Sequence, residues 1–248
     1  MGESQKTIML TGASRGIGHA TVKRFSDAGW RVITCSRGAV PGQCPWHAGD
    51  GDQDHIEIDL ESPEEIERGA AELMRRLDGR PLHALVNNAG ISPKGGNGER
   101  LDSILTPLDV WQLVFQVNVF APVMLARALI EPLERGNGTV VNVTSIAGSR
   151  VHEFAGSAYA SSKAALSALT REMASDFGKR GVRVNAIAPG EIMTEILSPG
   201  GEEAMLPGIP LGRFGTSAEV AETIFFLCNE SAAYINGAEL HVNGGQHV

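Results

Sequence analysis

Cysteine is scarce in this 248-residue chain, and the few cysteines present form no pattern. Cys35, Cys44 and Cys228 are odd in number and lie at unrelated spacings. A disulfide framework needs paired cysteines and a zinc site needs three or four ligands, so neither is expected. Cys44 and His47 form a Cys-x-x-His pair, but no second pair follows at ligand spacing. The sequence therefore predicts no metal site.

Clusters of basic residues are also missing. The chain has 21 Lys and Arg against 29 Asp and Glu, a formal net charge of −8, and no basic stripe is visible. This balance argues against nucleic acid or an anionic membrane as the main partner. No apolar run approaches the roughly 20 residues of a membrane span, and the first letters, MGESQKTIML, lack the layout of a signal peptide. We expect a soluble, cytoplasmic protein whose partner is a small molecule.

Short apolar runs alternate with helical patterns, which is typical of a parallel sheet with helices on both faces. The predicted strands are residues 6–10, 31–35, 56–60, 82–86, 139–143, 183–188 and 239–242. The predicted helices run from the glycine turn to residue 28 and over 63–77, 107–133, 157–178 and 217–229. Ser62 and Glu65 suggest a capping box at the second helix. No repeat or linker divides the chain, so we expect one α/β domain over residues 1–248 rather than two small ones.

One stretch breaks this alternation. Residues 38–55 are rich in Gly, Pro, Asp and Gln, and they lack a helical period where a crossover helix is expected. We predict a loop that crosses the sheet and leaves that face thinly covered, with Trp46 filling the gap.

A glycine-rich motif lies between the first predicted strand and the first predicted helix. Residues 11–18 read Thr-Gly-Ala-Ser-Arg-Gly-Ile-Gly. Glycines at such a turn permit a tight bend and a close approach to a pyrophosphate, and the helix N-terminus attracts the phosphate charge. A plain glycine-rich turn is the alternative, but the flanking strand and helix favour a dinucleotide site. The motif residues assigned to the cofactor are Gly12, Ser14, Arg15, Gly16, Ile17 and Gly18.

The end of the second strand is expected to contact the adenosine ribose, where an acidic residue favours NAD. This chain has Ser36 and Arg37 instead. Arg15 and Arg37 can form charge-assisted bonds to a 2′-phosphate, so the sequence predicts NADP(H), with NAD(H) as the alternative if both arginines are solvated surface charges. The residues predicted to border the adenine and the ribose are Asp59, Leu60, Asn88, Ala89 and Gly90.

Tyr159 and Lys163 lie four residues apart and therefore share a helix face. A nearby ammonium lowers the pKa of a phenol, which brings the hydroxyl closer to useful acid or base chemistry near neutral pH. Ser145 follows the apolar run 140–143, so its hydroxyl is expected at the carboxyl end of a strand, where open α/β sheets bind ligands. A surface Tyr and Lys on an ordinary helix is the alternative when the pair is taken by itself.

In combination, these motifs resemble those of the short-chain dehydrogenase/reductase family, in its single-domain branch. The resemblance covers nearly the whole chain, from Thr11 to Gly245. The matching residues are Thr-Gly-x-x-x-Gly-x-Gly at 11–18, Asn-Asn-Ala-Gly at 87–90, Asn118, Ser145, Tyr159-x-x-x-Lys163, and Pro189-Gly190 with Thr194 beyond. Two features depart from the family pattern, namely the 38–55 loop and Asn243, where family members often carry Asp.

The resemblance implies a Rossmann-like fold and a catalytic tetrad. Ser145 would hydrogen-bond the substrate carbonyl, Tyr159 would transfer the proton, and Lys163 would lower the phenol pKa and bind the nicotinamide ribose. Asn118 would hold a helix kink and a water. The resemblance also implies cofactor contacts at Pro189, Gly190, Ile192 and Thr194, and a homotetramer.

Substrate specificity is expected where the family pattern is least constant. We predict a lid over about 191–212, rich in Pro and Gly, and a second pocket wall over 92–109. The predicted activity is NADP(H)-dependent interconversion of a small ketone and a secondary alcohol. The alternatives are a 3-oxoacyl-thioester reductase that uses Lys179 and Arg180 to hold an acidic carrier protein, an NAD-linked sugar or alcohol dehydrogenase, and a dinucleotide-binding sensor without turnover.

Overall fold

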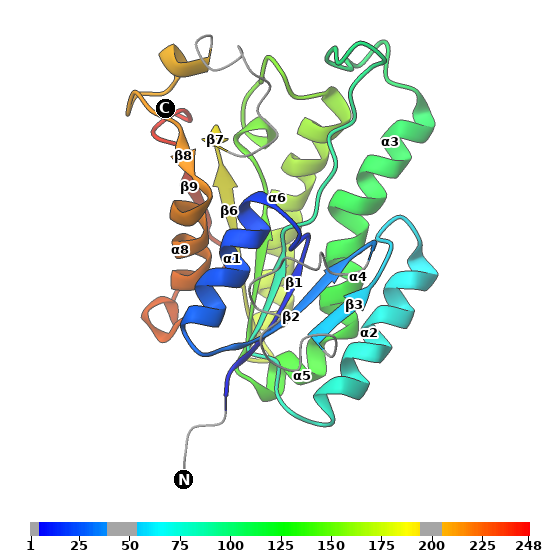
Figure 1. The fold of residues 1–248 in the computed structure, drawn as a ribbon, viewed down its shortest axis with the longest axis vertical. Coiled ribbons are helices and arrows are strands. Elements are labelled where there is room, and N and C mark those ends of the chain that lie inside the picture. The colour runs from blue at the N-terminus through cyan, green and yellow to red at the C-terminus, as the bar shows by residue number, and fades with distance from the viewer. Residues whose placement is uncertain (1–4, 39–53, 194–204) are drawn as a thin grey trace.

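Seven parallel strands form one sheet in the computed structural model, which describes residues 5–38, 54–193 and 205–248. The strand order is β3-β2-β1-β4-β5-β6-β9, so the chain starts near the middle and winds towards both edges (Figure 1). The strands are β1 (Thr7–Thr11), β2 (Arg31–Ser36), β3 (His55–Glu57), β4 (Ala84–Asn87), β5 (Thr139–Val143), β6 (Arg183–Pro189) and β9 (Glu239–Val242). The predicted doubly wound, seven-stranded α/β domain is confirmed.

Helices cover both faces of the sheet (Figure 1). Helices α1 (Gly16–Asp27) and α8 (Ser217–Leu227) cover one face, while α2 (Pro63–Leu77), α4 (Ala121–Ala128) and α6 (Ser157–Gly178) cover the other. Successive strand residues point to opposite faces. Ile8 accordingly packs with Phe25 of α1, and Met9 belongs to the cluster that contains Leu73 of α2. The apolar strands are thus buried on both sides.

The third strand is shorter than the prediction of 56–60. Ile58 still donates to the Ser36 carbonyl (3.0 Å), but Asp59 then turns the chain. Its carboxylate accepts from the Glu61 amide (3.0 Å) and its carbonyl accepts from the Ser62 amide (3.2 Å). The turn leads directly into α2 and ends the strand pairing.

The capping box predicted at α2 forms only in part. Ser62 Oγ accepts from the Glu65 amide (3.1 Å), but the Glu65 carboxylate pairs with Arg68 instead of returning to the cap. A complete, unpredicted box begins α8, where Thr216 and Glu219 each bond the backbone of the other.

The single helix predicted over 107–133 is interrupted. Helix α3 (Leu108–Phe115) passes through a π-helical turn, Gln116–Phe120, into α4, and α5 (Ile130–Arg135) follows. Pro132 explains the second break, because proline clashes with the carbonyl four residues earlier, at the end of α4. Two short strands, β7 (Ile192–Met193) and β8 (Gly215–Thr216), were not predicted, because two residues carry too little pattern.

The long crossover between β2 and β3 falls mostly outside the described residues. The predicted 38–55 loop, Trp46 included, is represented by its two ends only. At those ends, Arg31 pairs with Asp54 (2.7 Å) and the Gly38 carbonyl accepts from Ser36 Oγ (2.8 Å).

By length and composition, the helical stretch Leu108–Ala128 could cross a membrane, contrary to the expectation that no such stretch exists. A core helix of a soluble protein passes the same test. In this chain Asn118 and Leu125 are fully buried, so one side of the stretch faces the protein core.

A core truncation tests the packing of α2 on the sheet. Leu73 is fully buried, so Leu73→Ala should lower the free energy of unfolding by about 2–5 kcal/mol. Leu105 is 63% exposed, so the control Leu105→Ala should change it by less than about 0.5 kcal/mol. Urea unfolding measures both, and equal effects would contradict this packing.

Candidate active site

A cavity of about 1030 Å³ lies at the carboxyl ends of the central strands. Because all seven strands are parallel, the loops that follow β1, β2, β4, β5 and β6 meet at this edge. Residues predicted from the sequence for cofactor or substrate line it together: Gly12, Ser14, Arg15, Gly16, Ile17, Gly18, Ser36, Arg37, Asp59, Leu60, Asn88, Ala89, Gly90, Ser145, Tyr159, Lys163, Pro189, Gly190 and Ile192. Thr194 lies outside the described residues.

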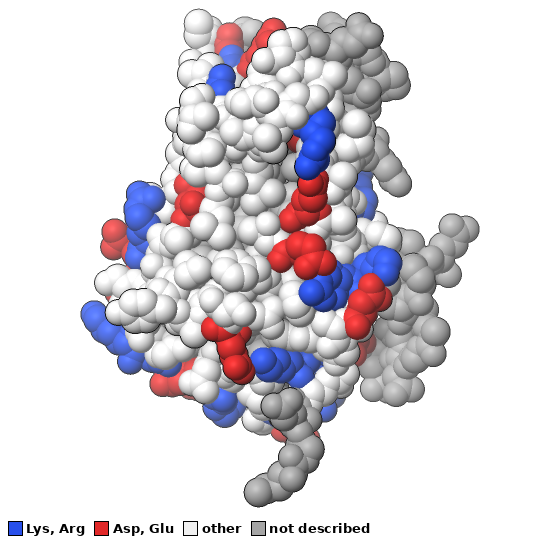
Figure 2. Space-filling model, turned by 90° about the vertical axis from the view of Figure 1, so that its left-hand side faces the viewer, with Lys and Arg blue, Asp and Glu red and all other residues white. Residues whose placement is uncertain are grey.

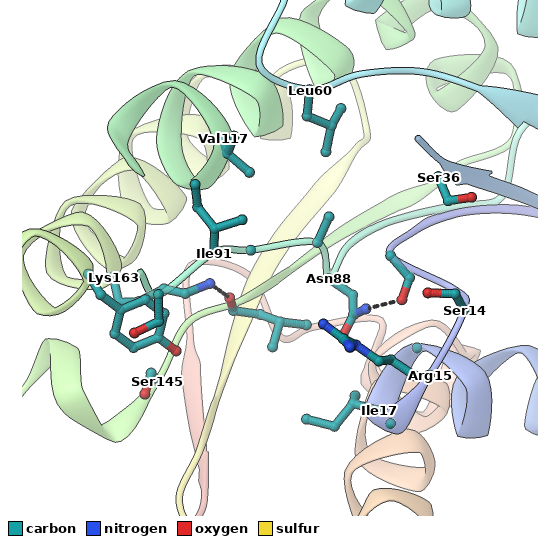
Figure 3. A pocket seen from close by; sticks show the side chains of 18 of the residues that line it. Ser14, Arg15, Ile17, Ser36, Leu60, Asn88, Ile91, Val117, Ser145 and Lys163 are labelled. Atoms are coloured by element: carbon teal, nitrogen blue, oxygen red, sulfur yellow. Dashed lines mark hydrogen bonds between the residues drawn. The ribbon is translucent and has the colours of Figure 1, made fainter. Parts of the chain in front are cut away.

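The glycine loop occupies one end of the cavity, together with Ser14 and Arg15 (Figure 3). Gly12 and Gly16 have positive φ angles of 69° and 55°, which L side chains rarely adopt. A Cβ on Gly18 would lie 2.0 Å from the Gly12 carbonyl oxygen. Asn88 Nδ2 donates to that same oxygen (2.9 Å) and so holds the loop against β4. A ligand can therefore approach the backbone of the glycine loop closely, and the bond from Asn88 holds that loop in position.

Two arginines and one unpredicted acid lie at the ribose end. Arg15 is exposed and makes no ion pair within the described part of the chain. The Arg37 guanidinium lies 3.3 Å from the Glu61 carboxylate, and both residues line the cavity. Glu61 was not among the predicted site residues, although it lies only two residues beyond Asp59. A carboxylate therefore lies beside Arg37, one of the two arginines predicted to bind a 2′-phosphate.

Ser145 and Lys163 lie at the other end of the cavity (Figure 3), and Tyr159 lines the cavity with them. Ser145 caps the short turn after β5, where its Oγ accepts from the Ala147 amide (3.2 Å). Burial raises the pKa of Tyr159, a hydrogen bond with Ser145 lowers it, and the charge of Glu191 raises it further. The net shift is upward, so the phenol holds its proton.

Lys163 lies one helical turn beyond Tyr159, and only 3% of it is exposed. Its Nζ donates to the Val143 carbonyl (2.7 Å) and lies 5.6 Å from the centre of the Tyr159 ring. Burial lowers the pKa of Lys163 to about 8. Lys163 was expected to lower the pKa of the Tyr159 phenol. Burial has the larger effect, because it raises the pKa of Tyr159 and lowers the pKa of Lys163.

Asn118 lies behind the cavity wall, fully buried in the π-helical turn. Its Oδ1 accepts from the Ile91 amide (2.9 Å), and its Nδ2 donates to the Ile91 carbonyl (3.0 Å) and to Ser162 Oγ (3.0 Å). Asn118 therefore ties the segment after β4 to α6, the helix that carries Tyr159 and Lys163. Ser162 gave no sequence signal of its own.

A nicotinamide dinucleotide fits this arrangement. The cavity extends from the glycine loop to Tyr159, and glycines occupy several of the closest approaches along it. Gly90 is one such approach, because a Cβ there would lie 3.1 Å from Lys163 Nζ and 3.3 Å from Asn118 Oδ1.

Known proteins resemble this chain over nearly its full length. A family model described as enoyl-(acyl carrier protein) reductase matches residues 12–247. Protein FixR of Bradyrhizobium diazoefficiens is 56% identical, over 98% of this chain and 87% of its own. The 3-oxoacyl-[acyl-carrier-protein] reductase FabG of Aquifex aeolicus is 35% identical, over 97% and 96%.

Two solved structures extend the comparison. An oxidoreductase of the short chain dehydrogenase/reductase family from Brucella ovis, in complex with a partially ordered NAD, has a TM-score of 0.83 and 61% identity, over 97% of this chain and 100% of that one. The RhlG/NADP active-site complex of Pseudomonas aeruginosa has a TM-score of 0.86 and 31% identity, over 99% and 98%.

Lys163 should make stability depend on pH. Its pKa is about 8 in the folded chain against 10.5 for an ordinary lysine, so between these two values the unfolded state binds more protons and stability rises with pH. The gain should reach at most about 3 kcal/mol, and Lys163→Met should lack it. Urea unfolding at several pH values compares the two proteins, and parallel profiles would refute the buried-lysine assignment.

Proposed function

Because this chain belongs to the short-chain dehydrogenase/reductase family and is an oxidoreductase of that family, we propose that it interconverts a small ketone and a secondary alcohol with NADP(H). One observation carries the proposal: Ser145 and Tyr159 line the same end of the cavity, opposite the glycine loop, and Ser145 is close enough to lower the pKa of the Tyr159 phenol. A pure binding protein has no need of that pair.

The residues divide the work between binding and proton transfer. The glycine loop and the N-terminus of α1 would hold the pyrophosphate, and Asn88 to Gly90 would border the ribose. When bound, the cofactor supplies or accepts the hydride.

Ser145 hydrogen-bonds the carbonyl oxygen, and Tyr159 gives its proton to that oxygen as negative charge develops. The Tyr159 phenol is protonated at neutral pH, as an ordinary phenol is, so it has a proton to donate in the direction of reduction. Alcohol oxidation runs the same proton transfer in reverse.

Lys163 and Asn118 act behind this pair. Lys163 is held by the Val143 carbonyl and borders the cavity, where it would bind the nicotinamide ribose and complete a path for the proton. Asn118 keeps α6 and the segment after β4 in register.

A 3-oxoacyl-thioester reductase is the second candidate, and the FabG relatives favour it. Lys179 and Arg180 were the two basic residues suggested for binding a carrier protein. Arg180 already pairs with Glu134 (2.5 Å), so it is less available to an acidic carrier. An NAD-linked sugar or alcohol dehydrogenase and a non-catalytic sensor remain the further alternatives.

The preference for NADP(H) rests on Arg15 and Arg37. Arg15 is unpaired within the described residues, and the Arg37–Glu61 pair is exposed on both sides, so it holds Arg37 only weakly. Arg37 could therefore exchange Glu61 for a 2′-phosphate. Glu61 opposes that exchange by repulsion, and the NAD complex from Brucella ovis is the observation that favours NAD(H) instead.

A small-molecule substrate, a cytoplasmic location and a homotetramer complete the proposal. On the face in Figure 2, Lys and Arg are interspersed with Asp and Glu and form no continuous basic patch, which supports the absence of nucleic acid among the partners.

Removal of one hydroxyl tests the catalytic assignment. Tyr159→Phe should lower kcat/KM for ketone reduction by about 10²- to 10⁴-fold, because the proton donor is lost. Cofactor affinity, measured by fluorescence titration, should change by less than about threefold, or ~0.7 kcal/mol. Tyr234 is fully exposed, so Tyr234→Phe is the matched control and should leave both quantities unchanged. Full activity in Tyr159→Phe would exclude this mechanism.

The cofactor preference is tested by titration with NADPH and NADH side by side. NADPH should bind at least about tenfold tighter, or roughly 1.4 kcal/mol. Arg37→Gln should narrow the difference and Glu61→Gln should widen it, whereas Arg75→Gln, on the exposed face of α2, should do neither. Equal or tighter binding of NADH would show that repulsion of a 2′-phosphate by Glu61 outweighs its attraction to Arg15 and Arg37.

A further inference from the structure

Glu191 places a carboxylate in the wall of the cavity, at the end where Tyr159 lies. It stands between Gly190 and Ile192, inside a stretch that sequence analysis assigned to the cofactor. Its charge is close enough to act on the Tyr159 phenol. Of the charged side chains that line the described part of the cavity, Arg15, Arg37, Asp59 and Glu61 lie towards the adenosine end, which leaves Glu191 and Lys163 near the reacting atoms.

The side chain and the backbone of Glu191 are each held by a neighbouring residue. His152 Nε2 lies 2.6 Å from Glu191 Oε1, and the Glu191 amide donates to Gln246 Oε1 (3.1 Å). Both side chains of the His–Glu pair are largely buried, with 19% and 13% exposed. The side chain is thus positioned rather than free to swing out into solvent.

The hydrogen bonds of His152 define which of its nitrogens carries the proton. Nδ1 accepts from the Phe154 amide (3.3 Å), so the proton resides on Nε2 and is donated to Glu191. In this arrangement His152 orients the Glu191 carboxylate through one donated hydrogen bond. Lys163, the nearby cation, is directed to the Val143 carbonyl.

One oxygen of Glu191 remains available. Oε1 is bonded to His152, whereas no partner for Oε2 occurs among the described residues. A carboxylate oxygen is an acceptor only, and when partly buried it strongly favours a donor. Lys94 and Arg100, on the neighbouring 92–109 segment, bond the carbonyls of Phe154 and Ala155 and do not line the cavity.

We propose that Glu191, oriented by His152, accepts a hydrogen bond from a hydroxyl group of the substrate, and that the substrates are therefore hydroxy-substituted ketones and the corresponding diols. This inference rests on the proposed function and narrows it. A plain alkyl ketone offers no donor near the carbonyl, and an anionic substrate is repelled. The alkyl ketone should be disfavoured because it would cover Oε2 of Glu191 without offering it a donor, and the anionic substrate because of charge repulsion.

Matched ketones that differ by one hydroxyl test the inference. The probes are hydroxyacetone against 2-butanone and 4-hydroxy-2-butanone against 2-pentanone, where a methyl group replaces the hydroxyl. In at least one pair, the wild-type chain should show a kcat/KM about tenfold or more higher for the hydroxyketone. No preference in either pair overturns the inference, and this measurement depends on no variant.

Substitution of the carboxylate then separates recognition from a structural role. Glu191→Gln and Glu191→Ala should each reduce the hydroxyl preference, which is the ratio of kcat/KM for the hydroxyketone to kcat/KM for its methyl partner, at least about fivefold. Glu67→Gln, on the exposed face of α2, is the matched control and should leave both values unchanged. An equal loss for both members of a pair would show that Glu191 only supports the site.

The outcomes also distinguish this inference from the proposed function. Turnover of all four ketones without a hydroxyl preference overturns the role of Glu191 alone. Absence of turnover for all four, with NADPH and with NADH, overturns the proposed ketone reductase activity and this inference with it.

Discussion

The parallel pairing of the seven strands is the constraint on which the site depends. In a parallel sheet every strand ends at the same edge, so residues far apart in the chain come together there. Gly12 follows β1, Asn88 follows β4, Ser145 follows β5 and Gly190 follows β6, and all four line one cavity. An antiparallel partner for any central strand would carry its functional loop to the opposite edge.

Close backbone contacts then bring the two halves of the cavity to their positions. Gly18 packs on the Gly12 carbonyl at a distance that leaves no room for a Cβ, and Gly90 packs closely beside the side chains of Lys163 and Asn118. Asn88 donates a hydrogen bond to the Gly12 carbonyl, and Asn118 bonds both the amide and the carbonyl of Ile91, the residue after Gly90. Each asparagine side chain therefore fixes the position of a loop at the cavity before a ligand binds.

The electrostatics of the cavity differ between its two ends. At the ribose end, charges are exposed and weakly paired, as in Arg37 with Glu61. At the inner end, the buried groups are expensive to charge, which raises the pKa of Tyr159 and lowers the pKa of Lys163. Glu191 adds a positioned negative charge to that inner end. The two ends of the cavity thus differ in burial and in the pairing of their charges.

Much of the fold was accessible from local patterns. The strand over 139–143, the helix over 157–178 and the strand over 239–242 were predicted at the bounds that the structure has, because apolar runs and helical periods extend over their full length. The third strand and the 107–133 helix were predicted too long, since the Asp59 turn, the π-helical turn and the effect of Pro132 depend on specific side-chain and backbone bonds. The functional roles of the predicted site residues stay predictions.

The sequence by itself determined the class of fold, the family and the identity of the residues that gather at the cavity, because these depend on hydrophobic periodicity and on motifs that occupy a few consecutive positions. Only the tertiary structure decided the protonation preference of Tyr159, the partner of Arg37 and the exposure of Glu191 to the cavity. These depend on burial and on contacts between residues 20 to 40 or more positions apart, such as Arg37 with Glu61 and His152 with Glu191. A local sequence pattern does not indicate such contacts, because the two side chains come close together only when the chain has folded into the sheet.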